Sequence, residues 1–220
     1  MSAFVKDQAT RRERKALATR RRILDAAETL FVRDGYAATT IAAIAIEADA
    51  AVQTVYAVFG TKRAVLTELL AVRVVGDDAA TPLKDRDDWR VMQAESEPGR
   101  QLERLAEIAT RIGERIGALY EVLAAAAGSD PEIARIYQRQ QRQRYNDQRR
   151  VARSLAAKGA LAPGLSEARA TDIMLAVANP SMHHRLVAQR QWSPEDYRRW
   201  LAHVLTCSLL KGIGHAAAAR

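Results

Sequence analysis

The stretch from Thr39 to Val65 constrains the fold most, because it encodes two short helices, the second of which is too short to be stable alone. Apolar residues recur at helical spacing on both sides of a turn at Asp49. Thr40 is placed to cap the first helix, and Gly60 is placed to end the second. Alanines along the first helix and the turn allow close packing at a steep angle. The pattern predicts a helix-turn-helix, whose second helix can lie in a DNA major groove.

The outward face of the second short helix supports this reading over an ordinary helical hairpin inside a bundle. Val52, Gln53, Thr54, Tyr56 and Ala57 form that face, which carries no charge and mixes small, amide, hydroxyl and phenol groups. Such groups suit base edges and phosphates better than bulk water. We expect Gln53 and Thr54 to contact base edges, and Val52 or Ala57 to contact a thymine methyl group.

A long pattern of residues at fixed offsets covers this stretch and the helix before it. It consists of RRRILDAAETLFVRDGYAATT, overlapping with TTIAAIAIEADAAVQTVYAVFGTKRAVL. From Arg20 to Leu70 the chain thereby resembles the N-terminal DNA-binding domain of the TetR family of transcriptional repressors. The resemblance implies that Tyr56 and Lys62 contact phosphates. The family usually has glycine at the turn where this chain has Asp49, which can adopt the left-handed conformation at some cost.

Two further groups of residues are candidate DNA contacts. Thr40 can present its hydroxyl and a helix N-terminus to a phosphate. Residues 1–22 hold eight Lys and Arg against two Asp and Glu, and we expect residues 1–19 to form a basic flexible arm. The arm either is a solvated tail or uses Arg11, Arg12 and Arg14 to follow phosphates or enter the minor groove. The first helix is predicted from about Lys15 to Arg33.

Composition restricts the class of protein. The chain has 220 residues, 48% of them hydrophobic, with few Gly and Pro and few alternating β-branched runs. These values predict an all-α fold with a sizeable core. The net charge of +8 favours a polyanionic partner. The single cysteine excludes an intramolecular disulfide and a cysteine metal site.

The sequence predicts two domains after the arm. Residues 20–75 make the helix-turn-helix domain with a connecting helix, and residues 76–220 make a ligand-binding and dimerisation domain. Residues 76–99 read as a linker with one or two helical turns around Trp89, and residues 215–220 as a frayed tail. Four long helices are predicted in the second domain, near residues 98–127, 131–158, 166–190 with a kink at Pro180, and 193–211.

The helix near 131–158 has an apolar face whose middle is polar. Either this helix leaves the core halfway along, or its polar residues line a pocket. A buried Arg144 would need a partner, which an anionic or carbonyl-bearing ligand could supply. The candidate pocket residues are Ile112, Ile116, Tyr120, Tyr137, Gln141, Arg144, Tyr145, Gln148, Met174 and His183.

The resemblance implies that the last two helices form a homodimer interface as a four-helix bundle. The candidates, shared between core and interface, are Leu175, Val177, Met182, Leu186, Leu201, Val204, Leu205, Cys207 and Leu209.

The sequence thus predicts a homodimeric regulator, most simply a repressor, that binds a palindromic double-stranded DNA operator and is released by a small-molecule effector. The alternatives are a helical small-molecule-binding enzyme and a membrane-surface protein. No phosphate-binding loop, HExxH motif or Cys/His zinc spacing occurs, so no catalytic residue, metal or cofactor is assigned. No apolar run reaches membrane-spanning length and the N-terminus lacks the apolar region of a signal peptide, so a cytoplasmic, nucleoid-associated location is expected.

Overall fold

A computed structural model describes residues 2–76, 83 and 86–212 of the chain, without the side chains of residues 2–12 and 75. The elements in chain order are α1 (Ser2–Ala38), α2 (Ile41–Glu47), α3 (Val52–Phe59), α4 (Lys62–Val75), α5 (Asp87–Ala94), α6 (Pro98–Ala127), α7 (Pro131–Ala157), α8 (Glu167–Val177), α9 (Pro180–His183), the π-helix η2 (His184–Gln189) and α10 (Pro194–Leu209). These residues form helices and, apart from one isolated bridge between Leu161 and Leu210, no β-structure. The predicted all-α fold is confirmed.

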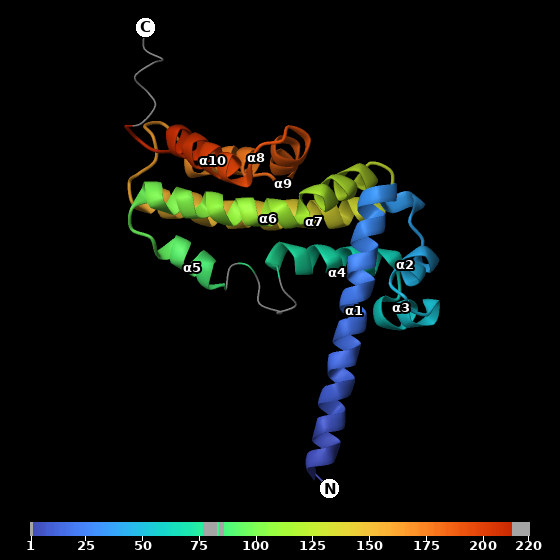
Figure 1. Ribbon diagram of the computed structural model, residues 1–220. Coiled ribbons are helices and arrows are strands. Elements are labelled where there is room, and N and C mark those ends of the chain that lie inside the picture. The colour runs from blue at the N-terminus through green and yellow to red at the C-terminus, as the bar shows by residue number, and fades with distance from the viewer. Residues whose placement is uncertain (1, 77–82, 84–85, 213–220) are drawn as a thin grey trace.

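Helices α6 and α7 form the middle layer of the described structure (Figure 1). Helices α8, α9 and α10 cover one side of this layer, and α4 and α5 lie against the other. The helix-turn-helix of α2 and α3 lies at one end of the layer, next to the C-terminal part of α1. The N-terminal part of α1 projects away from the layers and past α3.

Two clusters of buried apolar side chains stabilise these layers. The first joins α1 to α4 with the adjoining ends of α6 and α7, where Leu119, Leu123 and Ile133 are buried. The second lies among α5, α6, α7, α8 and α10, around Trp89 and Met174. Burying one large aliphatic side chain contributes about 1.5–3 kcal/mol. The helix-turn-helix is therefore attached to α6 and α7 by a continuous core.

Side-chain caps begin the helices where the sequence predicts them. Each capping side chain accepts a hydrogen bond from a backbone N–H two or three residues later, which satisfies donors that have no partner within the helix. The capping residues are Thr40, Thr61, Asp130, Ser166 and Ser193. Because these signals are local, the predicted starts of α2, α4, α7, α8 and α10 agree closely with the structure.

The N-terminal segment differs from its prediction. Helix α1 begins at Ser2 instead of near Lys15, so the segment expected to be a flexible arm is helical. Its Ala, Lys, Arg, Gln and Glu residues are strong helix formers, and they extend a helix already nucleated by its packed C-terminal part. Gly35 interrupts the regular helix with a φ of 82°. The side chains of Arg11 and Arg12, the tail 215–220, and residues 77–82 and 84–85 of the expected linker lie outside the described residues.

The helix predicted over residues 166–190 is divided rather than kinked. Helix α8 ends at Val177, and Asn179 has an extended backbone with φ −100° and ψ 132°. The ring of Pro180 disfavours a helical conformation at the residue before it. Asn179 Oδ1 then accepts from the backbone N–H of Ser181 at 3.0 Å and caps α9. The chain therefore restarts as the short α9, which continues into η2.

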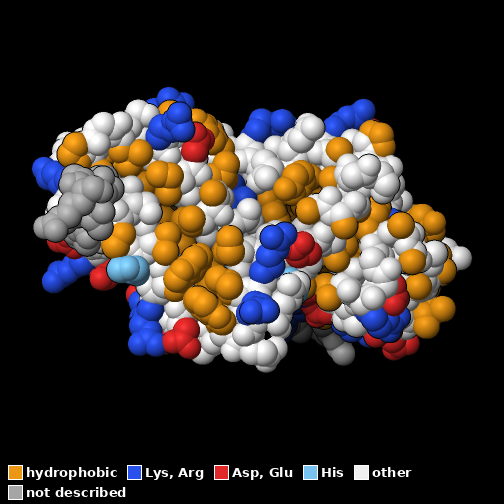
Figure 2. All heavy atoms as spheres, turned by 90° about the horizontal axis from the view of Figure 1, so that it is seen from above, with side chains coloured by type: hydrophobic (Ala, Val, Ile, Leu, Met, Phe, Trp, Pro, Cys, Tyr) orange, Lys and Arg blue, Asp and Glu red, His pale blue; other side chains and the backbone are white. Residues whose placement is uncertain are grey.

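The predicted dimerisation residues divide into two groups. Leu201, Leu205 and Leu209 are fully buried and belong to the core of the described chain. The others are partly exposed: Leu175, Val177, Met182, Leu186, Val204 and Cys207. Figure 2 shows hydrophobic side chains gathered on the face that α8, α9 and α10 present to the viewer. Six of the nine candidates are therefore free to make a further contact.

A close approach between α6 and α9 depends on Gly113. A Cβ atom there would lie 2.4 Å from Cγ of His183, so no other residue fits without movement. His183 is buried and its ring centroid lies 4.8 Å from that of Tyr197. Burial lowers the pKa of His183, which favours the neutral imidazole in this apolar contact.

We expect Gly113→Ala to lower the free energy of unfolding by about 1–2 kcal/mol, because overpacking costs more than the gain in helix propensity. Urea unfolding at a fixed protein concentration measures this change. Gly128→Ala is the matched control, since a Cβ at that helix end would lie 3.4 Å from its nearest neighbour, the carbonyl oxygen of Ala125, which is an ordinary contact distance. Equal stability of the Gly113 variant and the control would contradict the close packing of α6 and α9.

Candidate DNA-binding surface and ligand cavity

The turn between α2 and α3 has the geometry of a helix-turn-helix. The two helices are bent by 111° relative to each other, within the range of about 90–120° for this motif. Asp49 adopts a positive φ of 47°, as predicted for the position where the family usually has glycine. The backbone N–H of Ala50 donates to the carbonyl of Ala45 at 2.9 Å and closes the turn. The turn therefore forms with aspartate in the left-handed conformation.

Helix α3 divides its residues between the core and an open face. Val55 and Phe59 are buried, and Phe59 lies under the guanidinium of Arg20, 5.3 Å from the ring centroid. The predicted contact residues Gln53, Tyr56 and Ala57 are exposed, whereas Val52 and Thr54 are half-buried. Because Tyr56 keeps 53% of its surface exposed, its phenol is accessible to a partner.

Thr40 lies at the exposed N-terminus of α2, beside this face. Its hydroxyl oxygen accepts from the backbone N–H of Ala43 at 3.0 Å. The hydroxyl hydrogen can still donate to a phosphate, and the helix dipole favours an anion at this position. The geometry is compatible with the expected phosphate contact.

Lys62 has a different environment from the one that the phosphate prediction requires. Its ammonium donates to the carbonyl oxygens of Tyr36 (2.6 Å), Ala37 (3.3 Å) and Thr39 (2.6 Å). It also lies 4.3 Å from the ring centroid of Tyr36, and burial lowers its pKa. An ammonium has three N–H donors, and all three are used here. Lys62 thus fixes the connection between α1 and α2, and the structure does not support a phosphate contact by it.

Ion pairs hold α1 against α4. Arg20 pairs with Glu68. Arg73 pairs with Asp25 at 2.5 Å and with Glu28 at 2.7 Å. These contacts set the direction in which the basic N-terminal half of α1 leaves the domain. Arg14, one of the predicted arm contacts, is exposed on this half.

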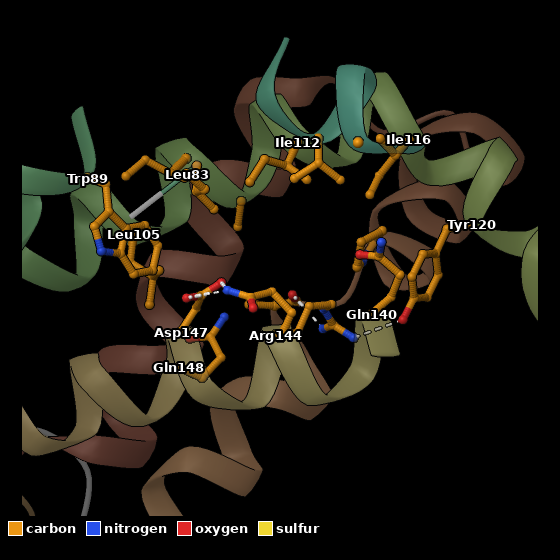
Figure 3. A pocket seen from close by; sticks show the side chains of 17 residues that line it. Leu83, Trp89, Leu105, Ile112, Ile116, Tyr120, Gln140, Arg144, Asp147 and Gln148 are labelled. Atoms are coloured by element: carbon orange, nitrogen blue, oxygen red, sulfur yellow. Dashed lines mark hydrogen bonds between the residues drawn. The ribbon is translucent and has the colours of Figure 1, made fainter. Parts of the chain in front are cut away.

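A cavity of about 410 Å³ lies between the middle layer and the α4 side of the molecule. This volume is within the range of small-molecule sites. Helix α6 supplies a largely apolar wall made by Leu105, Ile108, Ala109, Ile112, Ile116 and Tyr120. Helix α7 supplies a polar wall made by Gln140, Gln143, Arg144, Asp147 and Gln148. Figure 3 shows the labelled side chains of the two walls facing each other across the cavity, with Trp89 and Tyr120 at opposite ends.

The polar middle of α7 therefore lines a cavity. This agrees with the second of the two alternatives, in which the polar residues line a pocket, and not with a helix that leaves the core halfway along. Arg144 is satisfied by neutral groups of the protein: it donates to Tyr120 Oη (3.3 Å), Gln141 Oε1 (2.9 Å) and the carbonyls of Leu175 and Ala178 (3.1 Å each). Arg144 therefore does not need the anionic or carbonyl-bearing ligand that could have supplied its partner. Four of its five N–H donors have acceptors before any ligand binds.

Five of the ten predicted pocket residues line the cavity: Ile112, Ile116, Tyr120, Arg144 and Gln148. Tyr137 and Gln141 stand behind the wall, where Gln141 accepts from Tyr120 (2.8 Å) and donates to Tyr137 (3.1 Å). Tyr145, Met174 and His183 do not line it. Met174 belongs to the buried core and His183 packs against Tyr197. The helical periodicity of a sequence indicates which residues share one face of a helix, but it does not show which of their side chains line a cavity.

Four lining residues that sequence reasoning missed come from outside the long helices: Ala71, Val74, Leu83 and Trp89. The available signal was Trp89, a large apolar residue within a segment that otherwise reads as an acidic linker. Within the described part of the chain, Trp89 Nε1 and Gln148 Oε1 are buried without a hydrogen-bond partner. Such atoms cost free energy unless a further group pairs with them, so both are candidate ligand contacts.

Helix α4 connects the cavity with the DNA-binding domain. Ala71 and Val74 line the cavity, whereas Leu66 and Leu70 are buried in the core of the helix-turn-helix domain. Arg115 of α6 donates to the last carbonyls of α4, those of Arg73 (2.9 Å) and Val74 (3.1 Å). One helix therefore contributes both to the cavity wall and to the core beneath α3.

Comparison with known proteins agrees with this geometry. Residues 23–69 match the family model of bacterial regulatory proteins, tetR family. Over these residues the chain is similar to the DNA-binding domain of the TetR family. The match covers the end of α1, the helix-turn-helix and most of α4, which is where the sequence resemblance lies. A DNA-binding transcriptional regulator is the function that this match supports. No curated protein sequence matches the chain.

Solved structures share the fold beyond the matched domain. A protein from Saccharomonospora viridis in complex with choline has 20% identity and a TM-score of 0.66, over 88% of this chain and 98% of that one. NalD, a repressor of a multidrug efflux pump in Pseudomonas aeruginosa, has 19% identity and a TM-score of 0.63, over 89% and 98%. FadR from Bacillus subtilis in complex with stearoyl-CoA has 15% identity and a TM-score of 0.66, over 84% and 96%. The TetR-like fold thus extends through the C-terminal helices.

Two further properties of the described residues concern metal binding and the membrane. No group of three or more His, Cys, Asp or Glu side chains there could hold a metal ion. No single described helix is long and apolar enough to cross a membrane, and α2 with α3 reaches that length and composition only as a sharply bent pair.

Substitutions of Lys62 and Tyr56, the two residues that the family resemblance assigns to phosphates, should have different effects on stability and on DNA binding. Lys62→Met should lower the free energy of unfolding by about 1–3 kcal/mol, because three carbonyls lose a charged donor. Tyr56→Phe should leave stability within about 0.5 kcal/mol of wild type and weaken operator binding, since it removes only an exposed hydroxyl. Thermal unfolding and fluorescence anisotropy measure the two effects. If the Lys62 variant has wild-type stability but binds DNA weakly, the result would support the predicted phosphate contact of Lys62.

Proposed function

We propose that this chain is a homodimeric repressor that binds a palindromic operator and is released from it by a small molecule. The sharing of α4 carries this proposal, because one helix contributes to both the cavity and the core beneath α3. Two structures of the same fold are complexes with choline and with stearoyl-CoA, and these complexes support effector binding by this chain. The repressor role of NalD supports repression over activation.

The dimer would form through the face of α8, α9, η2 and α10. Five apolar side chains of this face are only partly buried within one copy: Leu175, Val177, Met182, Leu186 and Val204. A contiguous apolar surface on a soluble chain indicates a contact with another molecule. Pairing two copies by a twofold axis would bury it and place two α3 helices on one side of the dimer.

On DNA, α3 would enter the major groove. Gln53 and Thr54 would contact base edges, Val52 or Ala57 a thymine methyl group, and Tyr56 a phosphate. The helical N-terminal half of α1, which projects past α3 in Figure 1, would bring Arg14 toward the DNA backbone. Half-sites would be spaced by one helical turn, about 34–36 Å, or a multiple of it.

Release follows from linkage between the two sites. A ligand that binds more tightly when α4 holds the two α3 helices at an unsuitable separation weakens DNA binding by the same factor. Coupling of this kind is typically worth about 1–3 kcal/mol, or a 5- to 150-fold change in operator affinity. The cavity wall formed by Ala71 and Val74, together with Arg115 at the end of α4, provides the contacts through which the change would pass.

Selection of binding sites from a random pool of double-stranded DNA tests the regulator directly. The expected product is a palindrome with two equivalent half-sites, bound by two copies of the chain with a steep salt dependence. Recovery of no preferred sequence would contradict sequence-specific binding by α3.

The dimer proposal predicts that Val204→Glu shifts the chain to a monomer and lowers operator affinity by more than about tenfold, because a charge at an apolar contact is costly. Light scattering and anisotropy measure the two effects. Val91→Glu is the matched control, since Val91 on α5 is 50% exposed and lies away from the α8 and α10 face. Monomers that bind the palindrome as well as wild type would overturn the proposed interface.

A further inference from the structure

One exposed face of α7 is strongly basic. It carries six arginines: Arg135, Arg139, Arg142, Arg149, Arg150 and Arg153. The acidic groups paired with them are Glu132, which contacts Arg135, and Glu167, which lies 3.0 Å from Arg149 and 3.6 Å from Arg153. Arg139, Arg142 and Arg150 have no ion pair with any residue that the structure describes. This face therefore holds an excess of positive charge that the acidic side chains of the described residues do not balance.

The basic face borders the cavity at Gln143. The Gln143 side chain is exposed, lines the cavity, and also lines a shallow hollow with Arg149, Arg150 and Arg153. On the other side, Ala71 lines both the cavity and a groove between α4 and α7 that contains Arg139. The cavity thus adjoins one basic hollow and one groove in which three arginines lie beside Glu68 and Glu132.

Helix geometry places three of these side chains along one edge. Arg139 lies about one turn before Gln143, and Arg150 lies about two turns after it, so the three span about 16 Å of helix. We call Arg139, Gln143 and Arg150 the basic lip. The lip faces solvent, whereas the neighbouring face of α7, with Arg144 and Gln148, faces the cavity.

The interior of the cavity has no such excess of charge. Arg144 is satisfied by neutral acceptors, and Asp147 in the same wall accepts from Gln143 Nε2 at 3.1 and 3.2 Å. The opposite wall on α6 is made almost entirely of aliphatic side chains. An apolar group therefore suits the interior, and an anion suits the lip.

We propose that the effector is an anionic amphiphile, whose apolar part fills the cavity and whose phosphate or similar headgroup binds the basic lip. This inference rests on the proposed effector-released function and names the chemical class of the effector. A guanidinium matches the geometry of a phosphate with two parallel N–H donors, and such charge-assisted contacts are stronger than neutral ones. Taking about 30 Å³ for each water-sized group, the cavity holds an apolar chain of roughly a dozen such groups.

Other polyanions fit the lip less well. The recognition helix α3 lies at the end of the molecule, whereas the lip lies on the middle layer, so DNA bound by α3 does not need it. An anionic membrane would require exposed large apolar residues beside the arginines. The described residues of that kind are Leu17, Val32, Ile46, Tyr56 and Val91, and none lies on α7.

Calorimetric titration of the full-length protein with three ten-carbon probes tests the proposal. The probes are decyl phosphate, decanol and decyltrimethylammonium, each below its micelle concentration. Decyl phosphate should bind about tenfold more tightly than decanol at about 0.05 M salt, and the advantage should shrink at about 0.5 M salt because exposed charges are screened. The cationic probe should bind more weakly than decanol.

The double variant Arg139→Gln with Arg150→Gln should lose the advantage of decyl phosphate while its affinity for decanol stays unchanged. Arg33→Gln with Arg190→Gln is the matched control, since it removes two positive charges from exposed positions away from α7. This control should bind all three probes as wild type does. The probes differ only in their headgroups, so a loss confined to decyl phosphate is not explained by misfolding.

Four outcomes would overturn the proposal. Decyl phosphate could fail to bind, or bind no more tightly than decanol. Inorganic phosphate could compete as well as decyl phosphate, which would show an anion site without an apolar part. The lip variant could lose operator affinity in parallel, which would assign the lip to DNA. If decanol releases the operator as effectively as decyl phosphate, the effector-released function stands and only the headgroup inference fails; absence of any operator binding would instead refute the proposed function.

Discussion

The packing of α4 between the helix-turn-helix and the middle layer is the contact on which the rest of the structure depends. Helices α2 and α3 contain seven and eight residues, too few to be stable in isolation. Buried side chains of α4, such as Leu66 and Leu69, give them a core, and the opposite side of the same helix meets α6. The DNA-binding domain therefore cannot change its position without altering contacts that also form the cavity.

Much of this architecture could be predicted from the sequence because its signals are local. Thr40, Asp130 and Ser193 cap helices within three residues of themselves, and helical spacing shows which faces are apolar. Asp49 shows the same logic at a turn, since only a few residue types tolerate its positive φ. The length of α1 could not be predicted in this way. Whether a strongly helix-forming segment stays ordered depends on the packed helix from which it extends.

The candidate sites were less predictable because long side chains end far from their backbones. The position of Lys62 in the family pattern implies a phosphate contact, but sequence spacing does not show that the carbonyls of Tyr36 and Thr39 lie within 2.6 Å of its ammonium. The cavity shows the same limit. Helical period identified Arg144 on α7, yet the walls from Ala71 and Trp89 depend on how segments distant in the chain pack together.

Arg73 and Arg115 together show how short the path between the two sites is. The guanidinium of Arg115 caps α4 from α6, one residue from the cavity-lining Ile116, and it binds the carbonyl of Arg73. The side chain of Arg73 in turn pairs with Asp25 and Glu28 of α1, so two consecutive contacts join α6 at the cavity to α1. The C-terminal end of α4 therefore joins the cavity wall on α6 to α1 and α4, the two helices that orient α3.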